Sequence, residues 1–200
     1  MDGTLLDTAP GILDSLHSAI IDSGASVPRE KINNGLIGFS ISEIVDLLGL
    51  GDDAERKNAI IANFRRIYDA YAADGANWYD FSRRFIDRLR GQGTQIFIAT
   101  NKPCRATTAI VERLGIDFVT DIYFPDKYSD KTLKKTEMVA EIIKKYGLNP
   151  AETVVIGDTD VDFNAARENG CDFGFARHGY SLNAEFLEKN SDFVYGELTK

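Results

Sequence analysis

The segment of residues 153–162, Thr-Val-Val-Ile-Gly-Asp-Thr-Asp-Val-Asp, is the most informative part of the sequence for the fold class. Its first four residues are all β-branched, which predicts a short buried strand over residues 153–156. A glycine and three aspartates follow, and a helix is expected near residues 162–169. A strand, a polar turn and a helix in this order are typical of parallel α/β sheets, whose ligands bind beyond the carboxyl ends of the strands.

The chain repeats this alternation on both sides of the stretch. Further strands are expected at residues 95–99, 122–124, 172–176 and 193–195, and further helices at residues 81–89, after Pro103, and at residues 135–146. Short strands that alternate with helices predict an α/β fold with a Rossmann-like parallel sheet, covered by helices on both faces.

Residues 10–71 have a different pattern, because their apolar residues recur at helical spacing. Within this region Ser40 and Glu43 have the spacing of a capping box, so a helix is expected to begin near Ile41. The change of pattern therefore divides the chain into a helical region and an alternating α/β region.

The composition favours a cytoplasmic protein with small-molecule partners. A net charge of −8 disfavours nucleic acids and anionic membranes, which attract an excess of Lys and Arg. No apolar run approaches the roughly 18 residues that span a bilayer. Cys104 and Cys171 lack the spacing of a metal site and are expected to be reduced thiols. Nothing in the charge pattern marks an interface between copies of the chain.

Two of the predicted strands end in residues suited to charged ligands. Thr100-Asn101-Lys102 follows residues 95–99, and its hydroxyl and backbone amides beside Pro103 are suited to an oxyanion. The three aspartates after residues 153–156 would repel one another, and bound Mg²⁺ would relieve this repulsion. The alternative is that they only cap the next helix, whose dipole favours negative charge.

The segment Met1-Asp2-Gly3-Thr4-Leu5-Leu6-Asp7 is a third polar turn that contains glycine. Together the three segments resemble the motifs of haloacid dehalogenase-like hydrolases. In that family an apolar strand ends in Asp-x-Asp-Gly-Thr, a later strand ends in Ser or Thr, and another ends in Gly-Asp-x-x-x-Asp. The order along this chain is the same. The resemblance implies two domains, an α/β core of residues 1–11 and 79–200 and a helical cap domain of residues 12–78 that is inserted into it.

A lysine upstream of the last motif completes the family pattern. Lys135 fits best, because Lys-Thr-Glu-Met-Val resembles the Lys-Ala-Glu-Val-Ile of phosphoglycolate phosphatase-like members. Lys134 is the second choice. The alternative for both is a solvated face of a lysine-rich helix.

The resemblance implies a Mg²⁺-dependent phosphatase that acts on a small phosphorylated metabolite through an aspartyl phosphate. Asp2 would protonate the leaving alkoxide and then activate water, while its backbone carbonyl binds the metal. Thr100 and Lys135 would act in catalysis and bind the phosphoryl group, and Gly3, Thr4 and Asn101 would bind phosphate. Asp158 would be a ligand of Mg²⁺, and Asp162 would orient Lys135 or a water molecule bound to the metal.

Two further segments resemble this subgroup less closely. Residues 34–40 replace the Gly-Pro-Pro pattern of phosphoglycolate phosphatases, which weakens an assignment to phosphoglycolate. Arg177-His178-Gly179-Tyr180-Ser181 resembles the Gly-Tyr-Gly-Ser turn of the subgroup and predicts a structural role for His178.

The nucleophilic aspartate of the family would stand immediately before Met1, because Asp2 matches the second aspartate of the first motif. The 200 residues are therefore expected to be inactive by themselves, and one interpretation is that an upstream apolar strand ending in aspartate completes them. The alternatives are a non-catalytic protein that binds Mg²⁺ or phosphate, and a sugar phosphomutase.

Overall fold

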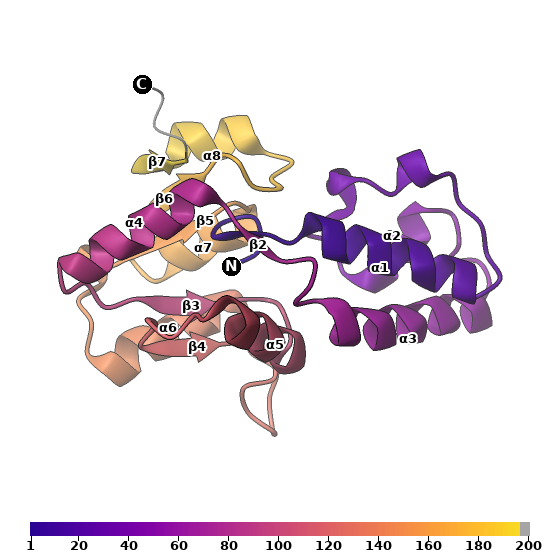
Figure 1. The fold of residues 1–200 in the computed structure, drawn as a ribbon. Helices are drawn as coiled ribbons and strands as arrows, with labels where there is room; N and C mark the ends of the chain where they lie inside the picture. Colours follow the sequence, from indigo (N-terminus) through magenta and orange to yellow (C-terminus); the bar gives the residue numbers. More distant parts are fainter. Residues whose placement is uncertain (197–200) are drawn as a thin grey trace. The chain divides into compact units, whose positions relative to one another are not determined.

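The polypeptide is divided into two units. The computed structural model describes residues 1–196 (Figure 1). Met1–Asp7 and Asn77–Lys200 form one unit, here called the α/β unit, and Thr8–Ala76 form the other, here called the helical unit.

The α/β unit alternates strands with helices, so the predicted fold class is confirmed. Three predicted elements, at residues 135–146, 172–176 and 193–195, have the observed bounds, and the other predicted strands and helices differ by one or two residues at their ends. The elements are β1 Leu6–Asp7, β2 Asn77–Trp78, α4 Asp80–Gly91, β3 Phe97–Ala99, α5 Cys104–Leu114, β4 Asp121–Tyr123, α6 Lys135–Tyr146, β5 Val154–Gly157, α7 Asp160–Glu168, β6 Asp172–Ala176, α8 Ala184–Asn190 and β7 Phe193–Tyr195.

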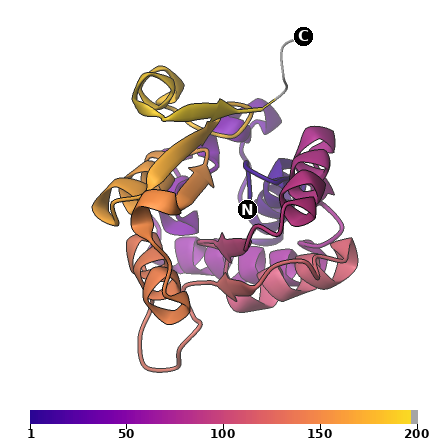
Figure 2. The same cartoon turned by 90° about the vertical axis from the view of Figure 1, so that its left-hand side faces the viewer.

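The parallel sheet is in two pieces rather than one. β3 pairs with β4, and β5, β6 and β7 pair in that order, all in parallel. Within residues 1–196, β3 and β5 each pair along one edge only, and Val154 at the start of β5 is 44% exposed. Figures 1 and 2 show the start of the chain between the two pieces, where Met1 is buried.

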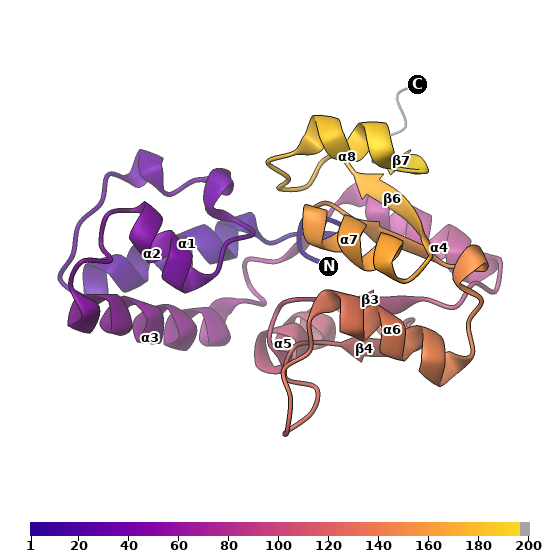
Figure 3. The same cartoon turned by 180° about the vertical axis from the view of Figure 1, so that it is seen from behind.

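Helices cover both faces of this divided sheet. Figure 1 shows α4 and α5 on the near face, and Figure 3 shows α6 and α7 on the opposite face. Phe173 and Phe175 of β6 are fully buried, in one cluster with Ala165 and Ala166 of α7. A second cluster joins Tyr123 of β4 to Met138 and Ile142 of α6. Burial of these apolar side chains stabilises the unit at about 25 cal/mol per Å² of apolar surface.

A short antiparallel pair, β1 with β2, was not predicted from the sequence. Leu6 lies opposite Trp78, and Asp7 lies opposite Asn77. Two-residue strands carry no measurable periodicity, so only the folded chain shows this pairing. It joins the two points at which the chain passes between the units.

The helical unit contains α1 Ala9–Asp22, α2 Ile41–Leu47 and α3 Ala54–Tyr71, with single turns of 3₁₀ helix at Arg29–Lys31 and Asn34–Leu36. The Ser40 and Glu43 capping box is confirmed at the start of α2. Near the two ends of the unit Gly11 and Gly75 touch, and a Cβ built on Gly75 would lie 2.3 Å from Cα of Gly11.

Two smaller expectations concern membranes and cysteines. None of the helices in residues 1–196 combines the length and apolar character that crossing a membrane requires. Cys104 is half-buried and Cys171 is buried, and both are free thiols as expected.

Asp121, at the start of β4, binds two lysines. Its carboxylate accepts hydrogen bonds from Lys127 at 2.7 Å, from Lys145 at 2.9 Å and from the Tyr146 hydroxyl at 3.0 Å. Burial alone would raise the pKa of Asp121, but these hydrogen bonds, with one from the Ile122 amide, hold the pKa well below its usual range. The carboxylate therefore ties the loop after β4 and the end of α6 to the sheet.

The substitution Asp121→Asn is expected to lower the free energy of unfolding by about 1–2 kcal/mol at pH 7. Because the pKa in the folded state is depressed, this contribution is complete above about pH 4 and is lost as the pH falls further. Urea denaturation of both proteins at pH 7, 5 and 3 measures the difference. A difference that stays constant down to pH 3 would contradict the assigned cause.

Candidate active site

Asp158 follows β5 and is held by the first turn of the chain. The Thr4 hydroxyl donates a hydrogen bond to Oδ1 of Asp158 at 3.0 Å, and the Tyr180 amide donates to Oδ2 at 2.9 Å. Asp158 is 3% exposed. The structure thus brings together two predicted motifs that lie 154 residues apart in the sequence.

Two glycines allow this close approach. Gly3 has a φ of +68°, and a Cβ at this position would lie 2.2 Å from Oδ2 of Asp158. A Cβ on Gly179 would lie 2.2 Å from Cβ of Asp158. Any larger residue would displace the carboxylate, so the local backbone requires glycine at both positions.

Lys135, the first residue of α6, forms a buried ion pair with Asp162 of α7. Nζ of Lys135 lies 2.6 Å from Oδ1 of Asp162. The other oxygen of Asp162 accepts hydrogen bonds from the Thr159 amide and hydroxyl, at 3.1 and 2.7 Å, and so caps α7. The helix-capping interpretation therefore holds for Asp162 but not for Asp158. Lys134 is exposed and precedes α6.

The charges at this site shift three pKa values. Burial would lower the pKa of Lys135, but the charge and hydrogen bond of Asp162 outweigh burial and raise it. Burial would likewise raise the pKa of Asp162, but the charge and hydrogen bond of Lys135 lower it. Burial, followed by the charge of Asp162, raises the pKa of Asp158. Lys135 and Asp162 are thus a charged pair, whereas the charge of Asp158 is poorly compensated.

Thr100 lies at the end of β3 and is buried. Its amide donates to the Tyr123 carbonyl at 2.9 Å, which continues the pairing of β3 with β4. Its Oγ1 accepts from the Lys102 amide at 3.2 Å, so the hydroxyl hydrogen can point to a ligand. Asn101 is exposed on the same turn.

Lys102 is a site residue that the sequence did not single out. Its side chain is 4% exposed, and Nζ lies 3.3 Å from Oδ1 of Asp2. The sequence places Lys102 beside Thr100, but the pairing with Asp2 crosses 100 residues and has no local signal. Tyr180 was also missed, although its hydroxyl donates to Asp7 at 2.8 Å. Both contacts fix the first turn of the chain.

The residues present fit Mg²⁺. Within residues 1–196 no lysine or arginine forms an ion pair with Asp158, so a cation beside this buried carboxylate would compensate its charge. No three His, Cys, Asp or Glu side chains gather as a ligand set in the described chain. Mg²⁺ suits such a site, because it usually takes one or two carboxylates and fills its remaining positions with water and substrate phosphate.

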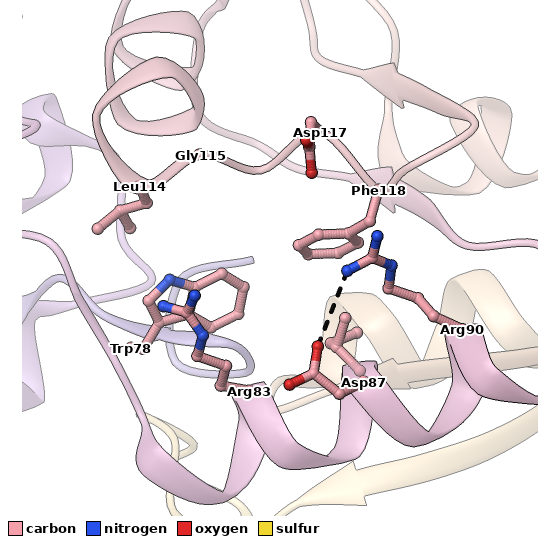
Figure 4. Close-up of a pocket in the computed structure, with 9 residues that line it drawn as sticks. Trp78, Arg83, Asp87, Arg90, Leu114, Gly115, Asp117 and Phe118 are labelled. Carbon is pink, nitrogen blue, oxygen red and sulfur yellow. Dashed lines mark ion pairs between the residues drawn. The ribbon is translucent and has the colours of Figure 1, made fainter.

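A cavity of about 120 Å³ lies away from these residues (Figure 4). Arg90 pairs with Asp87 at 3.8 Å and lies over the ring of Phe118. None of the predicted site residues lines the cavity, whose walls are Trp78, Arg83, Ile86, Asp87, Arg90, Leu114, Gly115, Asp117 and Phe118. The lining contains two arginines and two aspartates, so their formal charges sum to zero and do not favour a phosphate there.

Known proteins resemble this chain over nearly its whole length. The tyrosine-protein kinase PtkA of Mycobacterium tuberculosis is 28% identical over 194 residues, which are 97% of this chain and 65% of PtkA. A phosphoglycolate phosphatase of Yersinia pseudotuberculosis is 26% identical over 201 residues, which are 97% of this chain and 85% of that protein. A haloacid dehalogenase-like hydrolase of Streptococcus pneumoniae shares the fold, with a TM-score of 0.83 and 21% identity over 97% of this chain and 90% of its own.

Residues 1–176 match the family of haloacid dehalogenase-like hydrolases. The chain belongs to this family, as its three motifs and lysine predicted. It spans about two thirds of the length of PtkA and most of the length of the phosphoglycolate phosphatase.

Proposed function

We propose that this chain is a Mg²⁺-dependent phosphatase for a small phosphomonoester, similar to the phosphoglycolate phosphatases. The observation that carries the proposal is the contact of Thr4 with Asp158, which joins the first motif of the chain to the last. The buried Lys135 and Asp162 pair at the start of the neighbouring helices supplies a cation for the phosphoryl group. When bound, Mg²⁺ would neutralise the charge of the phosphoryl oxygens.

Each site residue has a proposed role in two displacement steps. If an aspartate is supplied immediately before Met1, its carboxylate attacks phosphorus, the bond to the leaving oxygen breaks, and Asp2 gives its proton to the alkoxide. Water then attacks the phosphorus of the aspartyl phosphate while Asp2 takes a proton from the water. The bond from phosphorus to the aspartate oxygen breaks, which restores the carboxylate and releases inorganic phosphate. Thr100 and Lys135 stabilise the phosphoryl oxygens in both steps, and the Asp2 carbonyl and Asp158 would hold Mg²⁺.

The surrounding residues have supporting roles in this proposal. Gly3, Thr4 and Asn101 complete the phosphate site, and Asp162 fixes Lys135. Lys102 orients the carboxylate of Asp2. Residues 12–78 serve as the cap domain that selects the substrate. A small phosphorylated metabolite in the cytoplasm, rather than a nucleic acid or a membrane, suits a chain with a net charge of −8.

The proposal is tested with the 200 residues preceded by an apolar strand that ends in aspartate. Phosphate release from phosphoglycolate, sugar phosphates and pyrophosphate is measured with and without Mg²⁺. Turnover of a small monoester is expected only with Mg²⁺, and Asp2→Asn should lower kcat by about 10²-fold or more. Isomerised sugar phosphate without release would indicate a phosphomutase. Binding of Mg²⁺ without any turnover would indicate a non-catalytic protein.

The identity to PtkA supports a second candidate, transfer of a phosphoryl group to a tyrosine hydroxyl. The same residues would stabilise phosphoryl oxygens whether the acceptor is water or a phenol. Incubation with ATP and a tyrosine-containing peptide tests this candidate, and phosphorylated peptide in excess of free phosphate would favour it over the phosphatase.

A further inference from the structure

The Thr4 carbonyl oxygen accepts hydrogen bonds from two distant side chains. Nε2 of His178 lies 3.0 Å away, and Oγ of Ser82 lies 3.3 Å away. Because a carbonyl oxygen only accepts, Nε2 of His178 must carry a hydrogen and donate it. Thr4 also donates through its hydroxyl to Asp158. The backbone and the side chain of Thr4 are therefore both fixed.

Tyr195 of β7 orients the Ser82 hydroxyl, which donates to the Thr4 carbonyl. Its hydroxyl donates to Oγ of Ser82 at 2.7 Å, and both residues are buried. Burial raises the pKa of Tyr195 to about 12, so the phenol keeps its hydrogen at neutral pH. The hydrogen bonds run in one direction, from Tyr195 to Ser82 and from Ser82 to Thr4.

Aromatic rings fix the orientation of the His178 imidazole. The rings of Tyr79 and Phe81 each lie 4.4 Å from it, centroid to centroid, at 71° and 75° to its plane. The ring of Tyr195 lies 5.5 Å away at 69°. Such edge-to-face contacts favour one orientation of the ring, so Nε2 is held toward Thr4.

The backbone beside His178 holds Asp158 from the other side. The Tyr180 amide, two residues along the chain, donates to Oδ2 of Asp158, while Thr4 donates to Oδ1. His178 thus links the segment bound to one carboxylate oxygen with the turn bound to the other.

The geometry points to His178, supported by Ser82 and Tyr195, as a positioning residue that fixes the Asp2-Gly3-Thr4 turn against Asp158 and so sets the affinity of the site for Mg²⁺. This inference rests on the proposed function, which makes Asp158 a ligand of the metal. It goes beyond a structural role for His178, because a residue that only packs would affect stability and leave metal affinity unchanged.

Calorimetric titration of the 200-residue protein with Mg²⁺ tests the inference. His178→Phe keeps an aromatic ring in the cluster and removes the donor, and the affinity for Mg²⁺ is expected to fall by about 10-fold or more. His178→Gln places an amide donor near the position of Nε2 and is expected to recover most of the loss. Phe85→Leu is the control, because Phe85 packs on Tyr195 at 4.9 Å without bonding to Thr4.

Thermal unfolding of each variant is measured beside the titration. Binding by the wild type that is unchanged in His178→Phe would overturn the inference alone, as would an equal loss in Phe85→Leu. A wild type that does not bind Mg²⁺, or binding that survives Asp158→Asn, would overturn the proposed function and with it the inference.

Discussion

Residues 1–200 by themselves are expected to release phosphate no faster than buffer, and an apolar strand that ends in aspartate, joined before Met1, is expected to raise the rate by roughly 10⁴-fold or more. Met1 is buried, and its amino group lies close enough to Lys135, Asp158 and Asp162 for their charges to act on it. A carboxylate carried by the preceding residue would therefore enter the cluster that the proposal assigns to the phosphoryl group.

The same addition should also stabilise the fold. β3 and β5 each have one edge that pairs with no strand within residues 1–196, and an added strand can satisfy the backbone groups there. A matched addition that ends in asparagine separates the two effects. Both additions should raise Tm, and only the one that ends in aspartate should give turnover. Equal turnover with the asparagine form, or normal turnover without any addition, would contradict the assigned nucleophile.

Replacing Lys135 by methionine is expected to lower the free energy of unfolding by about 3–5 kcal/mol, because it leaves Asp162 as a buried charge without its cation. Methionine keeps much of the apolar length of the lysine side chain, so the loss of packing is small. Urea denaturation at pH 7 measures the change.

Two variants make this measurement specific. Lys134→Met changes an exposed lysine at the adjacent position and is expected to alter stability by about 0.5 kcal/mol or less. The double substitution Lys135→Met and Asp162→Asn removes both charges, keeps an oxygen to cap α7, and is expected to recover part of the loss. A loss with Lys134→Met equal to that with Lys135→Met would show that the buried pair is not the cause.

Elements with strong local signals could be predicted from the sequence. The helix at residues 135–146 has the predicted bounds, because the Glu137 carboxylate accepts a hydrogen bond from the Lys134 amide at one end and Gly147 adopts the left-handed conformation at the other. The turns that follow β3 and β5 were expected at the carboxyl ends of strands, where the sheet presents them to one site. Helix ends and turns of this kind can be predicted from the sequence because each depends on only a few neighbouring residues.

Contacts between distant segments could not be predicted. Lys102 approaches Asp2, and Ser82 and His178 both bind the Thr4 carbonyl, only after the chain has folded. The motifs predicted which residues gather, and tertiary packing decides how each is held.

The pairing of Asp7 with Asn77 has a consequence for the modular design of the chain. Opposed residues of an antiparallel pair lie about 5 Å apart, so the 69 residues of Thr8–Ala76 leave and rejoin the α/β unit at almost the same point. A short turn could bridge that distance. The inserted residues therefore leave the strand order of the α/β unit unchanged. Segments of other lengths could replace them between β1 and β2 without changing that order.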